Sequence, residues 1–141
     1  FAETIDKIST DKEVIELKPE VITTKAHDAL NDNADHFVMR LVKVEVKPED
    51  AEKFAHEVKK EMTTSMAAEP GMEIMMSGVN KKNENEWYFV EVYFDDKAYD
   101  AHIKSPQYVE YIENTDGMVA RRDVKDLVRD TLATQGAIVL D

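Results

Sequence analysis

FVEVYFDDKAYDAHIKSPQYVEYI, residues 89–112, decides the fold of this chain because its pattern changes from strand to helix and then breaks. Apolar and polar residues alternate at its start, which is typical of a strand. Asp95 is a favourable N-cap for a short helix, and Ser105 followed by Pro106 begins a second one. The stretch therefore predicts a strand followed by a helix that is interrupted just after His102.

The residues before this stretch predict a strand, a helix and a second strand. HFVMRLVKVEV, residues 36–46, is rich in β-branched residues and alternates. Residues 47–71 then change period, and EPG at their end stops the helix because Pro70 disfavours helical geometry in the residue before it. Residues 72–79 and 86–94 flank a polar hairpin loop over 80–85. The apolar stripe of the helix is formed by Ala51, Phe54, Val58, Met62 and Met66.

The last element, residues 119–132, has a pattern that fits either a helix or a strand. The preceding order of strand, helix, strand, strand, helix is that of the ferredoxin-like split βαβ arrangement, which needs a fourth strand here. We therefore predict a strand. The fold class that follows is α+β, with the helices on one face of an antiparallel sheet.

Residues 1–36 differ from the rest, with short apolar clusters, a Lys-Pro and a polar end, NDNADH. We interpret them as an N-terminal arm and linker, and residues 37–141 as the single folded domain. The arm is either a flexible leader or a segment that docks on the main body or on a partner subunit.

The composition excludes several classes of function. A net charge of −12 repels nucleic acid and anionic lipid surfaces. The chain has no cysteine, which excludes disulfides and thiolate chemistry, and no apolar run long enough for membrane insertion. The cytoplasm is the default compartment, but export after removal of a leader stays open because the sequence begins at Phe1 rather than methionine.

Nucleotide-binding, zinc-hydrolase and serine-hydrolase motifs are missing from the sequence. The four histidines, at positions 27, 36, 56 and 102, are scattered, with no pair three or four residues apart. We therefore predict no metal site.

The run from His36 to about Arg129 resembles the antibiotic biosynthesis monooxygenase family. The resemblance is carried by KPED at 47–50, EPGMEIMM at 69–76 and FVEVYFDDKAYDAHIKSPQYVEYI. It implies a ferredoxin-like monomer whose sheet faces that of a second copy, so that the homodimer forms an α/β barrel with a substrate cavity between sheet and helices in each monomer. Members include oxygenases that act on aromatic or quinol compounds without metal, flavin or haem, and isomerase-like proteins that process a quorum-sensing sugar phosphate.

For this chain, the resemblance implies a cofactor-independent monooxygenase that acts on an aromatic or quinol-like molecule with dioxygen. His102 is the expected base, because imidazole accepts a proton near neutral pH, and Glu91 is expected to orient it. Aromatic walls for the substrate are expected from Tyr93, Trp87 and Tyr108, and an oxyanion contact from Arg40.

Structural alternatives stay open for each of these residues. His102 can cap a helix end or bond a backbone carbonyl, and Glu91 can form an ion pair with Arg121 or Arg122 at a dimer interface. Trp87 and the tyrosines can fill the core or an interface. For the whole chain, the alternatives are an isomerase of a small hydroxyketone or sugar phosphate, and a non-catalytic ligand-binding dimer.

Overall fold

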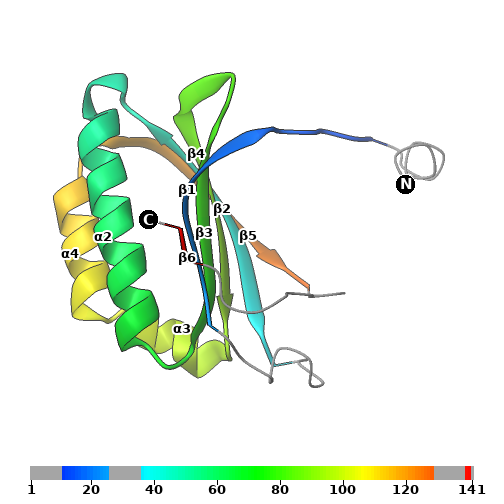
Figure 1. Ribbon diagram of the computed structural model, residues 1–141, viewed down its shortest axis with the longest axis vertical. Coiled ribbons are helices and arrows are strands. Elements are labelled where there is room, and N and C mark those ends of the chain that lie inside the picture. The colour runs from blue at the N-terminus through cyan, green and yellow to red at the C-terminus, as the bar shows by residue number, and fades with distance from the viewer. Residues whose placement is uncertain (1–10, 26–35, 129–138, 141) are drawn as a thin grey trace.

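The computed structural model describes residues 11–25, 36–128 and 139–140. Figure 1 shows helices and strands as two layers, with the helices on one side of the sheet. In chain order the elements are β1 (Leu17–Thr24), β2 (Val38–Val46), the short 3-10 helix η2 (Pro48–Asp50), α2 (Ala51–Ala68), β3 (Met72–Asn80), β4 (Asn83–Tyr93), α3 (Asp96–His102), α4 (Pro106–Thr115), β5 (Val119–Leu127) and β6 (Val139–Leu140).

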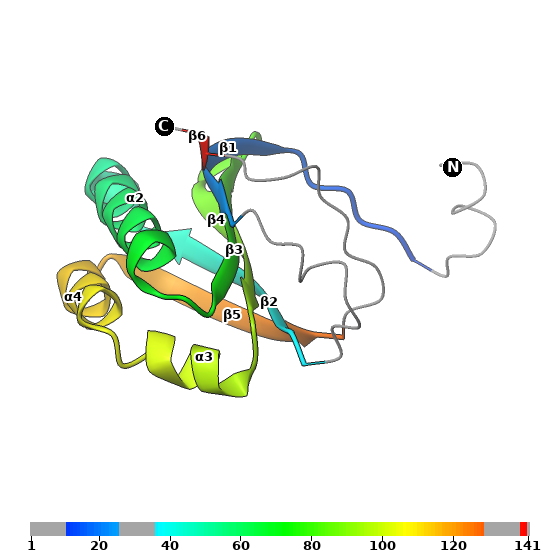
Figure 2. The same ribbon diagram turned by 60° about the horizontal axis from the view of Figure 1, so that its bottom comes forward.

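The sheet has the order β5-β2-β4-β3-β1-β6, and each neighbouring pair of strands is antiparallel. Its part β5-β2-β4-β3 is the ferredoxin-like arrangement, so the predicted α+β fold class is confirmed. Helices α2, α3 and α4 cover one face (Figure 2). Among the described residues, none of the helices has the length and apolar character needed to span a bilayer.

The strand predicted at 119–132 is present as β5, which pairs with β2 through Val44↔Arg122. Residues 129–132 lie outside the described residues. The hairpin loop predicted over 80–85 is shorter than expected, because β3 continues to Asn80 and β4 begins at Asn83. The Asn80 side chain accounts for the tight turn, since its Oδ1 accepts a hydrogen bond from Lys82 N at 2.9 Å.

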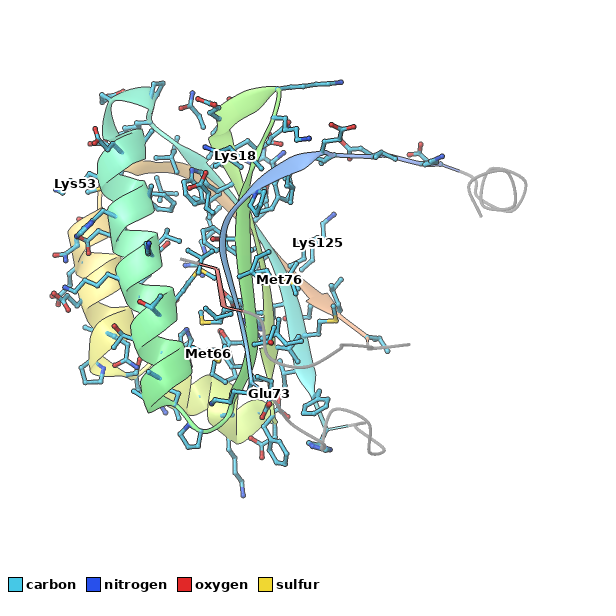
Figure 3. The ribbon with its side chains drawn as sticks, viewed as in Figure 1. Lys18, Lys53, Met66, Glu73, Met76 and Lys125 are labelled. Carbon is cyan, nitrogen blue, oxygen red and sulfur yellow. The ribbon has the colours of Figure 1, made fainter. Side chains whose placement is uncertain are left out.

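Part of the N-terminal arm docks on the main body. Strand β1 pairs with β3, with Ile22 opposite Met76. Lys25, just beyond β1, donates from its backbone N to Glu73 O at 3.0 Å and from Nζ to the Glu69 carbonyl. Lys25 of the arm therefore bonds both ends of the turn between α2 and β3, Glu69 and Glu73; Glu73 is labelled in Figure 3. The division of the chain at residues 36 and 37 stays a prediction.

The main core lies between α2 and the sheet. The predicted stripe of α2 is buried at Phe54, Val58 and Met62, and Met66 packs against the same core (Figure 3). Because side chains of a strand alternate between faces, Trp87, Phe89, Glu91 and Tyr93 of β4 share the face that the helices cover. The inner face of β4 therefore meets the end of α3, where His102 lies.

The EPG turn fixes the distance between β3 and α3. A Cβ atom added to Gly71 would collide with Ala98 Cβ of α3. We expect Gly71→Ala to lower the free energy of unfolding by about 1–3 kcal/mol, as overpacking does in a close-packed site, and urea denaturation would measure it. Adding Ala98→Gly to this variant removes the colliding atom, so the double variant should lose less stability than the sum of the two single changes. A Gly71→Ala protein as stable as the wild type would contradict this account of the turn.

Candidate active site

A cavity of about 210 Å³ lies between the helices and the sheet. Its walls come from β2, β4 and β5 and from α2, α4 and the end of α3. The apolar part of the wall consists of Val42, Val44, Val58, Met62, Phe89, Ile112 and Val119. The polar part consists of Glu61, Glu91, His102, Tyr108, Tyr111, Thr115, Asp116 and Arg122. An apolar chamber with a few converging polar groups is the usual form of a small-molecule site.

His102 is the last residue of α3, and its imidazole lines this cavity with 2% of its surface exposed. The helix starts at Asp95, whose Oδ1 accepts a hydrogen bond from Ala98 N at 2.8 Å. A new helix starts at Ser105, whose hydroxyl accepts a hydrogen bond from Tyr108 N at 3.3 Å. The helix break predicted after His102 is therefore present, and it leaves the imidazole inside the protein.

Glu69 holds the imidazole of His102. Its two carboxylate oxygens lie 3.0 and 3.1 Å from His102 Nδ1, and Gln107 Nε2 donates a hydrogen bond to Glu69 Oε1 at 2.6 Å. Because an ionised carboxylate only accepts hydrogen bonds, Nδ1 carries a proton and Nε2 is the basic nitrogen of the neutral ring. Nδ1 therefore bonds a carboxylate and not a backbone carbonyl.

Glu61 lies on the other side of the same ring. Its Oε1 is 3.9 Å from His102 Nε2 and accepts a hydrogen bond from Ser65 Oγ at 2.7 Å. Burial raises the pKa of Glu61 to about 7, although the Ser65 hydrogen bond and the charge of His102 act in the opposite direction. The imidazole therefore lies between two carboxyl groups.

The pKa of His102 is raised above the ordinary value for imidazole. Burial alone lowers it, but the Glu69 hydrogen bond and the charges of Glu61, Glu69 and Glu91 outweigh burial. The pKa of Glu69 is lowered: burial raises it, and hydrogen bonds from His102 and Gln107 outweigh that effect. Both shifts have one cause, the attraction between a protonated imidazole and an ionised carboxylate.

Glu91 lines the cavity, but the prediction that it orients His102 is wrong, because Glu69 makes that contact. Glu91 Oε2 instead accepts a hydrogen bond from Tyr93 Oη at 2.9 Å. The two residues are neighbours on one strand face, so this bond forms within β4. The predicted alternative, an ion pair with Arg121 or Arg122 at a dimer interface, stays a prediction; within the single chain Arg121 pairs with Asp123 at 3.1 Å.

Tyr108 and Arg122 bring polar groups to the cavity from α4 and β5. The Tyr108 ring lines the cavity, with its centroid 4.8 Å from that of His102, and its predicted role as a substrate wall stays a prediction. Burial lowers the pKa of Arg122, but interaction with the Tyr108 hydroxyl outweighs burial, so the pKa is raised overall and the guanidinium stays charged. Arg122 is the cation that lines the chamber.

Three predicted substrate contacts lie outside the cavity wall. Arg40 stacks over the Tyr99 ring at 3.7 Å, with its Nε 3.1 Å from Asp126 Oδ1. Trp87 is core, with ring centroids 5.3 Å from Phe54 and 6.1 Å from Phe89. Tyr93 is buried, and its hydroxyl donates a hydrogen bond to Glu91. All three share the helix-facing side of the sheet, but they do not line the chamber, which strand alternation does not reveal.

Sequence reasoning missed Glu61 and Glu69, and it named Arg122 only as an alternative partner of Glu91. Glu69 belongs to the EPG motif, which the sequence marks only as the end of a helix, and it lies 33 positions from its partner. No group of three His, Cys, Asp or Glu side chains within the described residues is arranged to hold a metal ion.

Comparisons with known proteins agree with this architecture. The family model described as antibiotic biosynthesis monooxygenase matches residues 37–114. A provisionally named monooxygenase of known structure from Lactobacillus acidophilus NCFM is 71% identical, with a TM-score of 0.92, over 100% of this chain and 64% of that one. A provisionally named antibiotic biosynthesis monooxygenase from Bacteroides thetaiotaomicron VPI-5482 is 28% identical, with a TM-score of 0.70, over 73% of this chain and 98% of that one.

A third structure, of a provisionally named monooxygenase from Fusobacterium nucleatum subsp. nucleatum ATCC 25586, shares the fold at 23% identity and a TM-score of 0.87, over 99% of this chain and 62% of that one. This chain therefore spans less than two thirds of the length of the Lactobacillus and Fusobacterium proteins. No curated protein matches the chain.

Proposed function

The chain belongs to the antibiotic biosynthesis monooxygenase family, and from this premise we propose that it oxidises a single-ring phenol or quinol with dioxygen, without a bound cofactor. The observation that carries the proposal is a buried imidazole, held at Nδ1 by Glu69, which lines an apolar chamber. Such a group can take a proton from a ring hydroxyl where water is largely excluded.

The chemistry needs few protein groups. His102 Nε2 accepts the hydroxyl proton, and the resulting electron-rich ring anion reduces dioxygen directly. With a hydroquinone, one oxygen atom enters the ring and the other leaves as water, so that hydroquinone and dioxygen give a hydroxyquinone and water. The Arg122 guanidinium, which lines the chamber, would stabilise the anion.

The size of the cavity supports a small substrate. A cavity of about 150 Å³ is enough to bind benzene, whereas drug-sized ligands occupy about 300–1,000 Å³. At about 210 Å³, this chamber fits one substituted ring better than a polycyclic compound.

Oxygen uptake tests the proposal. We expect the metal-free protein to consume dioxygen with a single-ring hydroquinone, and to place one labelled atom from ¹⁸O₂ in the hydroxyquinone product. Buffer with heat-inactivated protein measures autoxidation. Absence of catalysed uptake across a panel of single-ring phenols and quinols would overturn the proposal.

One feature also suits the alternative isomerase function. Glu61 and His102 face one cavity as two proton-carrying groups, which enolisation of a hydroxyketone requires. Arg122 would then bind a phosphate. Turnover of a hydroxyketone under anaerobic conditions would favour this second function, because the oxygenase reaction stops without dioxygen.

We also propose a homodimer in which a second copy covers the sheet face away from the helices. That face carries a shallow apolar groove that includes Leu41, Met76 and Val90, and Met76 and Lys125 lie on this side in Figure 3. Leu41 and Val90 are cross-strand neighbours on it. An apolar patch of this kind is typical of a protein interface.

We expect Leu41→Lys to convert the dimer to a monomer, because an unpaired charge in an apolar interface is costly. Val109→Lys is the matched control, since Val109 is an exposed apolar residue on α4 and lies on the helix side. Sedimentation velocity separates the outcomes. A wild-type monomer, or an equal effect of both variants, would argue against this interface.

A further inference from the structure

We propose that Glu61 takes the proton from His102 and passes it to solvent through a second, smaller cavity between α2 and α4. The inference rests on the proposed function, because it concerns the fate of the proton that His102 removes. A hydroquinone has two hydroxyl protons, and one neutral imidazole accepts only one. The imidazolium must therefore pass its first proton on before it can act again. The overall reaction releases no net proton, so the protons that leave through Glu61 are balanced by those that the water product takes up from solvent.

The second cavity has a volume of about 70 Å³ and lies on the outer side of Glu61. Glu61 and Tyr111 line both cavities, so these two side chains form the partition between them. Lys60 and Glu110 line the outer cavity from α2 and α4, with side chains that are 48% and 51% exposed. A route from Glu61 to solvent therefore exists beside the substrate chamber.

The outer cavity is suited to water. One water occupies about 30 Å³ in the liquid and needs two to four polar partners, so 70 Å³ has room for about two. Glu61, Thr64 and Gln107 supply such partners. Water bound there can carry a proton from the Glu61 carboxyl group to the surface.

The inner part of the route is the contact between Glu61 Oε1 and His102 Nε2, which are 3.9 Å apart. That separation exceeds a direct hydrogen bond, but contacts between catalytic groups are often long before substrate binds, and one water bridges such a gap. Ser65 fixes the Glu61 carboxyl group by its hydrogen bond of 2.7 Å. The carboxyl group is thus held next to the basic nitrogen.

The proton affinities of the two groups also suit a relay. A pKa of about 7 lets Glu61 both accept and release a proton near neutral pH. An ordinary exposed glutamate would release it but would seldom hold it. The ionisable groups that act on Glu61 or share its cavities are His102, Glu69, Glu91, Tyr93, Tyr108, Tyr111, Arg122, Asp116, Glu57, Lys60 and Glu110.

Glu61→Gln tests the route, because glutamine keeps the size of the side chain and an oxygen for Ser65 but cannot carry the proton. We expect kcat for an ordinary hydroquinone to fall about 10²-fold, the lower end of the usual contribution of a proton-transfer group. An electron-poor hydroquinone that is already ionised in the buffer should lose much less. Glu52→Gln, an exposed site on the same helix with the same change in charge, should behave as the wild type.

A second measurement does not depend on turnover. In the wild type, the NMR titration of His102 should show two coupled steps, because the Glu61 and His102 charges interact. In Glu61→Gln the step that comes from Glu61 should be lost, while the coupling to Glu69 remains. Equal kcat losses for both hydroquinones, or no loss at all, would overturn the relay while wild-type oxygen uptake leaves the proposed function standing. If the wild type consumes no oxygen, a single-step wild-type titration would overturn the relay as well.

Discussion

Replacing His102 by alanine is expected to lower kcat/KM for a hydroquinone by about 10²–10⁴-fold, the usual contribution of a positioned general base. The physical reason is that His102 brings the basic nitrogen to the chamber, with its other nitrogen already held by Glu69. Oxygen uptake and product formation, each corrected for autoxidation, measure the effect.

The matched control is His56→Ala, because His56 is exposed on α2 and lines none of the described cavities. His102→Ala also leaves the buried Glu61 and the partly buried Glu69 without their partner, which costs stability. The His102→Asn variant and a thermal melt of each protein therefore separate loss of chemistry from loss of folding. Near wild-type turnover in a folded His102 variant would remove the imidazole from the mechanism.

Replacing Glu69 by glutamine should change both the rate and its pH dependence. The base works only when His102 is neutral, and the wild-type pKa is raised, so activity falls as pH drops below a value above the ordinary imidazole pKa. Loss of the Glu69 charge lowers that pKa, so the acid limb of kcat/KM moves to lower pH. The plateau should fall about 10²-fold, because the ring is no longer held in position.

Glu113→Gln is the control for this change, since Glu113 is an exposed carboxylate on α4. Profiles of kcat/KM against pH for the three proteins check the result. An unshifted acid limb in Glu69→Gln would show that Glu69 does not set the proton affinity of His102, whatever happens to the plateau.

Much of the fold follows from local sequence pattern. Alternation in residues 36–46 and 86–94, the apolar stripe of α2 and the Ser-Pro after His102 each act over a few residues, so each element could be placed. The strand at β5 is different: its own pattern is ambiguous, and the order of the preceding elements decided it. Strand β1 forms by pairing with the edge of β3, and no pattern within the arm itself specifies that pairing.

The site could be predicted only in part. The broken helix marks His102, and Tyr108 follows on the next turn of helix. The partners of His102 depend on how α2 crosses the sheet, so nothing near position 102 indicates Glu61 or Glu69. Strand alternation predicts the face of a residue but not its depth along the strand. That is why Arg40 was predicted where Arg122 lies.

The most direct test of the account is the ionisation state of a bound phenol. A phenol that absorbs differently in its neutral and ionised forms, and that dioxygen does not oxidise, can be titrated with the protein at a pH below its solution pKa. We predict that the phenolate band appears on binding to the wild type and is absent with His102→Ala. A phenol that binds in the chamber and stays neutral in the wild type would contradict the claim that this imidazole takes the proton.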